Sequence, residues 1–100
     1  MIVINFDEST KPMSELGALV ITKGADALMR GLKINPFFYF YRHLQGDWGD
    51  ICDEDRQTNE DALISGNRLM SVYNVIAEER IWIITEADRS VTTILLPEEY

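Results

Sequence analysis

The chain has 100 residues, of which 46% are hydrophobic and 26% are charged, and its formal net charge is −8. This length suits one domain with a core that needs no disulfide or metal, and the hydrophobic content excludes a wholly disordered chain. A charge this negative repels nucleic-acid phosphates, and the sequence contains no apolar run long enough to span a bilayer. Acidic Asp7 and Glu8 stand where a signal peptide would be basic. We therefore expect one domain over residues 1–100, soluble and cytoplasmic, without membrane or direct nucleic-acid contact.

The first fifteen residues are the least defined part of the sequence. MIVINF suits a short strand, whereas the segment after it is polar and interrupted by Pro12. The apolar, β-branched run LGALVIT at residues 16–22 predicts a strand. Thr22 can cap a short helix that runs through Met29 and stops at Gly31.

A second helix is predicted to start at Asn35–Pro36. An asparagine side chain accepts a hydrogen bond from the first turn, and a proline has no amide hydrogen to leave unpaired there. The helix runs through FFYFYRHL and stops near Gly46. His43 then lies in the last turn, where an imidazolium interacts favourably with the helix dipole.

The aromatic run of this helix and the residues after it have two possible roles. Most of the aromatic side chains are expected in the core, but an exposed Tyr39 or Tyr41 beside acids would suit a protein interface. GDWG reads as a tight connection whose Trp48 folds over the core or serves as a binding platform. A third helix is predicted from Asp53 or Asp55 to Gly66, since acids favour a helix start and glycine a helix end.

The last third of the chain changes to strand periodicity. RLMSVYNV, RIWIITEA and SVTTILLP are rich in β-branched and aromatic residues and are separated by short polar connections, which predicts a three-stranded antiparallel β-meander. The middle strand is apolar on both faces, so we expect helices to cover both. The predicted fold class is α+β, with two to three helices followed by the meander and an N-terminal strand as an open addition.

Acidic residues cluster between positions 47 and 61, where Arg56 is the only basic residue. The plain interpretation is a solvated acidic face. The functional interpretation is a surface that attracts a basic protein, including one that otherwise holds nucleic acid. The candidate binding residues are Asp47, Trp48, Asp50, Asp53, Glu54 and Asp55.

Single cysteine and histidine residues limit the metal chemistry that we expect. A lone thiol at Cys52 forms no internal disulfide, and we expect it to be partly buried. His43 with Asp47 and Asp50 provides neither a fourth zinc ligand nor the spacing of a calcium loop. We therefore predict no metal site and no cofactor.

Several longer motifs resemble one family of bacterial proteins. LGALVITKGA, RHLQGDWGD, NEDAL, GNRLMSVY and WIITEADRSVTTILLPEEY are similar to small plasmid-related proteins of plasmids and integrative elements, some of which are labelled type I restriction subunits. The resemblance extends from Leu16 to Tyr100. It implies a mobile genetic element as the setting and does not imply a particular activity.

The function that we expect is a non-enzymatic accessory factor that binds a protein partner and inhibits a host defence or nucleic-acid-handling complex. One alternative is a metal-independent, barnase-like ribonuclease with His43 as general acid or base, Arg89 stabilising phosphorane charge and Thr92 positioning the phosphate. In that alternative Glu86 and Asp88 compete for Arg89 as ion-pair partners. A second alternative is a dimeric regulatory or structural subunit that pairs through an exposed edge of the meander. The sequence leaves both a monomer and a homodimer open.

Overall fold

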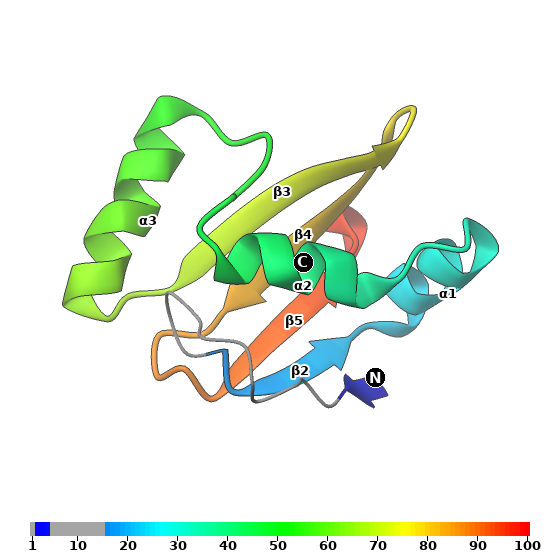
Figure 1. Cartoon of the computed structure of the whole chain (residues 1–100), viewed down its shortest axis with the longest axis horizontal. Coiled ribbons are helices and arrows are strands. Elements are labelled where there is room, and N and C mark those ends of the chain that lie inside the picture. Colours follow the sequence, from blue (N-terminus) through cyan, green and yellow to red (C-terminus); the bar gives the residue numbers. More distant parts are fainter. Residues whose placement is uncertain (1, 5–15) are drawn as a thin grey trace.

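The computed structural model of the chain describes residues 2–4 and 16–100, and its strands form one five-stranded sheet (Figure 1). The order across the sheet is β1-β2-β5-β4-β3. The strands are β1 (Ile2–Ile4), β2 (Ala18–Ile21), β3 (Leu69–Ile76), β4 (Glu79–Thr85) and β5 (Val91–Leu95).

Strand pairing confirms the predicted α+β class and the C-terminal meander. β3 pairs antiparallel with β4, and β4 pairs antiparallel with β5. β2 lies parallel to β5, with Ala18 opposite Val91, and β1 adds antiparallel to the far side of β2. The N-terminal strand left open by the sequence is therefore present, whereas the predictions that fall on residue 1 and residues 5–15 lie outside the described residues.

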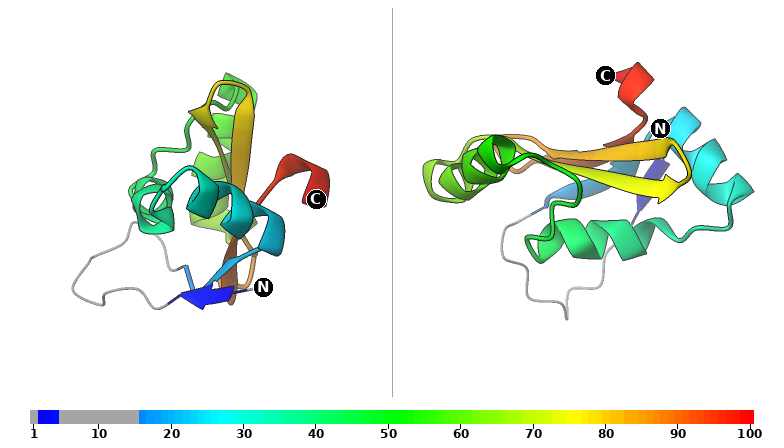
Figure 2. Two further views of the ribbon diagram at one scale, coloured as in Figure 1. Left: turned by 90° about the vertical axis from the view of Figure 1, so that its right-hand side faces the viewer. Right: turned by 90° about the horizontal axis from the view of Figure 1, so that it is seen from above.

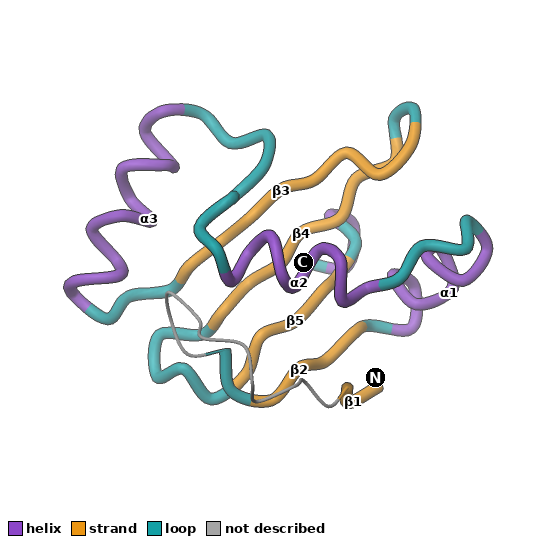
Figure 3. The backbone as a smooth tube through the Cα atoms, viewed as in Figure 1, coloured by secondary structure: helices purple, strands orange, loops and turns teal. Residues whose placement is uncertain are grey.

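Three helices occupy the predicted parts of the chain: α1 (Lys23–Gly31), α2 (Pro36–Leu44) and α3 (Asp53–Ser65) (Figure 3). A short 3-10 turn that the sequence did not predict, η1 (Pro97–Glu99), follows β5. The predicted caps of α1 and α2 are confirmed, because Thr22 Oγ1 accepts from the amide of Ala25 at 3.2 Å and Asn35 Oδ1 accepts from the amide of Phe37 at 3.0 Å. None of the helices in the described ranges is long and apolar enough to cross a membrane.

All three helices end where the sequence indicated, and a glycine in the left-handed conformation follows two of them. Gly46 and Gly66 have φ values of 84° and 83°, as expected of glycine after a helix. Gly31 does not take this conformation. Lys33, two residues later, has φ 57° instead. α1 nevertheless ends at Gly31, as predicted, and the amide of Lys33 donates to the carbonyl of Arg30 at 3.1 Å.

Helices cover only one face of the sheet, contrary to the expectation of cover on both (Figure 2). α2 lies across the buried face, and α3 lies beside β3. On the opposite face the C-terminal end folds back so that the rings of Tyr100 and Trp82 stand edge to face, with centroids 5.3 Å apart. The second apolar face of β4 is therefore covered by η1 and Tyr100 instead of by a helix.

The core lies between α2 and the covered face of the sheet and is closed at one end by α1. Side chains on alternate positions of each strand share this face. Hydrophobic members of the core, all buried, come from every layer: Leu16, Leu19, Ile21, Ala25, Met29, Tyr39, Phe40, Leu44, Tyr73, Ile81, Ile83 and Ile94.

Candidate functional site

α3 is an acidic helix that stands largely free of the rest of the molecule (Figure 1). Of its thirteen residues, only Asn59 and Ala62 are buried. Asp53, Glu54 and Asp55 form its first turn, where carboxylates interact favourably with the amide end of the helix dipole. The helix therefore gains stability from its acids while it presents them to solvent.

The outward side of α3 carries two pairs of carboxylates. Positions seven apart on a helix lie on nearly the same side, so Asp53 and Glu54 are followed two turns later by Glu60 and Asp61, about 10.5 Å along the axis. Asp61 accepts a hydrogen bond from Gln57 at 3.0 Å. Within the described ranges only two ion pairs occur, Asp26 with Arg30 and Asp47 with Arg42, so the acids of α3 are not neutralised by ion pairs there.

Asp47 and Asp50, by contrast, partly serve the connection between α2 and α3. Nε of Arg42 donates to Asp47 at 2.7 Å, and the amide of Gly49 donates to the same carboxylate at 3.2 Å. The hydrogen bond from Arg42 lowers the pKa of Asp47 below its usual value. Asp50 accepts from the side-chain amide of Asn74. Both carboxylates remain exposed, but their orientation is fixed by these contacts.

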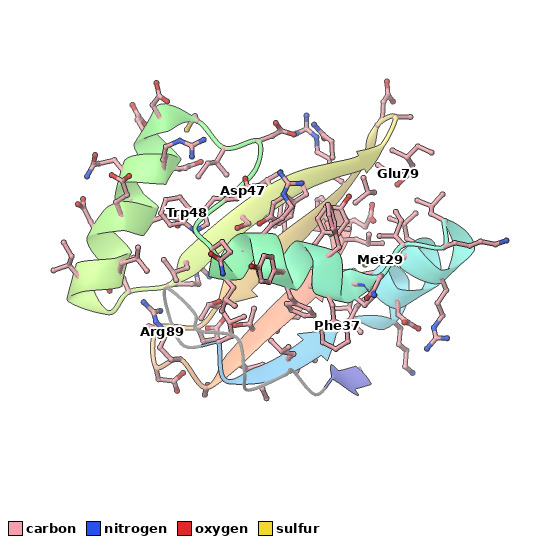
Figure 4. The ribbon with its side chains drawn as sticks, in the orientation of Figure 1. Met29, Phe37, Asp47, Trp48, Glu79 and Arg89 are labelled. Atoms are coloured by element: carbon pink, nitrogen blue, oxygen red, sulfur yellow. The ribbon has the colours of Figure 1, made fainter. Side chains whose placement is uncertain are left out.

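Trp48 points inward from the connection between α2 and α3 and leaves only 4% of its surface exposed (Figure 4). Its carbonyl accepts from the amide of Val72 at 3.0 Å, and the amide of Asp50 donates to the carbonyl of Val72 at 2.7 Å. Gly49 is required between them, because a Cβ there would lie 2.0 Å from the carbonyl oxygen of Val72. Trp48 thus anchors the candidate surface from beneath, as a core lid.

Asn59 continues this cover along the outer edge of β3. Its Oδ1 accepts from the amide of Met70 at 3.1 Å, and its Nδ2 donates to the carbonyl of the same residue at 2.7 Å. The side-chain amide therefore replaces a neighbouring strand at Met70, as the loop does at Val72. These contacts occupy the edge through which the dimeric alternative would pair, apart from its end at Asn74 and Ile76.

Arg89 fixes the other end of α3. It lies in the β4–β5 turn with φ 60°, and its guanidinium donates to the carbonyls of Ala62 at 3.1 Å and Asn67 at 2.7 Å (Figure 4). The expected ion pairs with Glu86 and Asp88 do not form: Arg89 takes the carbonyl of Glu86 at 3.2 Å, and the Asp88 carboxylate accepts from the amide of Ser90. The Ala62 carbonyl, which also accepts from the amide of Gly66 at 2.9 Å, thus joins the end of α3 to the β4–β5 turn.

His43 is the buried centre of a polar chain that joins α2 to three strands. Its imidazole is 2% exposed, with Nδ1 2.5 Å from Ser71 Oγ and Nε2 2.8 Å from Thr85 Oγ1. Thr85 Oγ1 lies 2.7 Å from Thr92 Oγ1. Thr92 Oγ1 in turn donates to the carbonyl of Leu16 at 2.7 Å.

The Leu16 carbonyl at the end of this series of hydrogen bonds decides which group donates in each of them. The Leu16 carbonyl can only accept, so the Thr92 hydroxyl donates to it and accepts from Thr85, which in turn accepts from Nε2–H of His43. Nδ1 is then the acceptor for the Ser71 hydroxyl. A neutral imidazole satisfies all of these bonds. Burial, with a smaller contribution from the charge of Arg89, lowers the pKa of His43 from 6.5 to about 4.

This geometry replaces the expectation that a charged His43 interacts with the end of α2. It also separates the residues of the ribonuclease alternative: His43 and Thr92 share a buried chain, but Arg89 is bound to carbonyls at the end of α3. A general acid or base must reach its substrate within hydrogen-bond distance. Both ring nitrogens of His43 are already engaged beneath α2, so the arrangement gives that alternative no support.

Other reactive groups do not assemble into a site. Cys52 is exposed as the residue before α3, which corrects the expectation of partial burial. Across residues 2–4 and 16–100, no three side chains of His, Cys, Asp or Glu come together where they could hold a metal ion.

Comparisons with known proteins found no matching family model, no matching curated protein and no matching solved structure. The resemblance to plasmid-related proteins therefore rests on sequence motifs alone.

Three polar residues with structural roles were not identified from the sequence. Asn59, inside the charged helix α3, holds that helix to β3, whereas Ser71 and Thr85, at inward positions of apolar strands, bond to His43 of α2. A polar residue at a buried strand position was the available signal, because such a group needs a partner. Its pairing with His43 depends on how α2 crosses the sheet, which no local pattern encodes.

Proposed function

We propose that this chain is an acidic, non-enzymatic protein-binding factor of a mobile genetic element. It acts in the cytoplasm by occupying the basic surface of a nucleic-acid-handling complex, such as a restriction or CRISPR effector. The observation that supports this most is the outward side of α3, where Asp53, Glu54, Glu60 and Asp61 have no ion-pair partner among the described residues.

Charge complementarity gives the physical basis of the proposal. A protein surface that binds a phosphate backbone carries Lys and Arg side chains whose counterions are released on binding. Two carboxylate pairs about 10.5 Å apart on a rigid helix offer such a surface an alternative anion. The net charge of −8 also accelerates the approach of a basic partner at low ionic strength.

Anchoring at both ends and in the middle favours a rigid surface. The connection at Trp48 precedes α3, Asn59 holds its middle to β3, and Arg89 holds its last turn. A surface already ordered before binding loses less conformational entropy when a partner docks. This is why a helix with so little buried surface can serve as a recognition element.

The proposal is tested by expressing the chain in bacteria that carry an active restriction or CRISPR system and measuring the plating of unprotected phage. The decisive variant is Glu60→Lys with Asp61→Lys. Both positions lie outside the first turn of α3, so the new lysines do not repel the positive end of the helix dipole. The matched control, Glu78→Lys with Glu79→Lys, makes the same charge change at two exposed positions, one in the β3–β4 turn and the other at the start of β4. Wild type and control should raise phage plating and the α3 variant should not. No effect of the wild type on either defence, or equal effects of both variants, contradicts the proposal.

A further inference from the structure

α2 carries exposed aromatic side chains that the core does not use. Phe40 and Leu44 are buried, whereas Phe38 and Tyr41, one turn apart on the opposite side, are 59% and 51% exposed. No described element lies over this side of α2 (Figure 2). Two large exposed apolar side chains on adjacent turns of one short helix are typical of an interaction site.

Arg42 completes this surface and is held rigidly beside it. It follows Phe38 by one helical turn, which makes the two side chains neighbours. Its guanidinium lies 4.6 Å from the centre of the Tyr73 ring and donates to Asp47 at 2.7 Å. We define Phe38, Tyr41 and Arg42 as the aromatic stripe. Aromatic and Arg side chains of this kind are enriched at the energetic centres of protein interfaces.

Charges at the two ends of the stripe differ in sign. Lys33 is exposed in the turn before α2, whereas Asp47 adjoins Arg42 and leads along the chain to Asp50 and the acids of α3. Arg42 already neutralises Asp47, so a segment that fits this surface needs apolar side chains over α2 and positive charge at the end that leads to Asp50 and α3. A wholly polar basic segment would leave the aromatic side chains exposed.

We propose that the aromatic stripe is the apolar anchor of the docking surface and that its occupant is a basic, amphipathic segment of a partner protein. Apolar side chains of that segment rest on Phe38 and Tyr41, and its Lys or Arg side chains reach Asp50 and the acids of α3. The inference rests on the proposed function, because it describes which part of the same basic partner makes contact.

Two labelled peptides of about 18 residues, or five helical turns, test the inference by fluorescence anisotropy. One is an amphipathic peptide of lysine and leucine, and the other replaces every leucine by serine at equal charge. The leucine peptide should bind wild type about tenfold more tightly, a difference of about 1.4 kcal/mol. Phe38→Ser with Tyr41→Ser should abolish that difference and keep the affinity for the serine peptide. Ile76→Ser, an exposed apolar site on the β3–β4 hairpin, is the matched control and should retain the difference.

The outcomes separate this inference from the proposed function. Equal binding of the two peptides to wild type, or a difference that survives Phe38→Ser with Tyr41→Ser, overturns the inference and leaves charge recognition intact. Peptide affinities unchanged by Glu60→Lys with Asp61→Lys contradict the proposed function and leave the stripe as an apolar site. Absence of binding by either peptide contradicts both. A wild-type dimer that dissociates on substitution of the stripe, seen by sedimentation, assigns the stripe to a second copy and overturns the inference.

Discussion

Nε2 of His43 lies 2.8 Å from Oγ1 of Thr85, which connects α2 to a strand forty-two residues later in the sequence. The hydroxyl of Thr85 accepts a hydrogen bond from Nε2–H of His43 and donates one to Oγ1 of Thr92. A single hydroxyl therefore satisfies two buried polar groups. The position of α2 across the sheet depends on this contact as well as on the apolar core.

Replacing that hydroxyl should measurably destabilise the fold. Thr85→Val leaves Nε2–H of His43 buried without an acceptor, so we expect the free energy of unfolding to fall by about 1–3 kcal/mol. Thr93→Val is the matched control, since Thr93 is the half-buried neighbour of Thr92 on the strand, and should change stability by less than about 0.5 kcal/mol. Urea denaturation measures both. Equal losses in the two variants would show that the hydroxyl of Thr85 carries no special role.

The free energy of unfolding should also depend on pH through the titration of His43. The pKa of His43 falls from 6.5 in the unfolded chain to about 4 in the fold, so the unfolded chain binds the proton first. Stability is then complete above pH 6.5 and declines as the pH falls towards 4, by about 3 kcal/mol in total. Nitrogen chemical shifts of the imidazole should show the neutral Nε2–H tautomer wherever the pH lies well above 4. A histidine that titrates near 6.5 in the folded protein contradicts the buried neutral state.

Asn59 should be essential to the attachment of α3. Asn59→Ala removes both hydrogen bonds to Met70, and we expect a loss of about 1–3 kcal/mol together with faster hydrogen exchange of the Met70 amide. Asn67→Ala, in the exposed link after α3, serves as the control. Retained protection of Met70 in the Asn59 variant would mean that α3 is held by other contacts.

Arg89 offers a test in which two substitutions separate hydrogen bonding from backbone strain. Arg89→Ala loses the bonds to the carbonyls of Ala62 and Asn67 and should cost about 1–2 kcal/mol. Arg89→Gly loses the same bonds but removes the cost of a left-handed φ, so it should be about 1 kcal/mol more stable than the alanine variant. Thermal denaturation ranks the three proteins. An alanine variant as stable as wild type would show that the hydrogen bonds of Arg89 do not stabilise the fold.

Most of the local structure is predictable because each element has its own signal in the sequence. Thr22, Asn35 and Gly66 mark helix ends through bonds and conformations that involve only neighbouring residues. The meander follows from strand periodicity and short connections. The pairing of β2 with β5 is not predictable in this way, because a parallel neighbour is joined through the intervening helices and two other strands.

The candidate site was predictable in composition but not in architecture. The acids of α3 are visible in the sequence, and their exposure follows from their charge. The burial of Trp48 was one of its two expected roles, whereas the burial of His43 is not visible, because it depends on contacts with β3 and β4 made after the chain folds back. Exposure of Tyr41 and burial of Tyr39 resolve an alternative that the aromatic run alone left open.

Capture of partners from bacterial lysate is the sharpest test of whether the acids of α3 bind a basic protein. Wild type, Glu60→Lys with Asp61→Lys, and Glu78→Lys with Glu79→Lys are immobilised in equal amounts, and retained proteins are identified by mass spectrometry. Wild type and the Glu78 and Glu79 variant should retain nucleic-acid-handling proteins that elute when salt is raised to about 1 M, where the Debye length is about 3 Å. The Glu60 and Asp61 variant should retain none of them. Retention that is equal in all three proteins, or no retained protein with the wild type, would contradict the account.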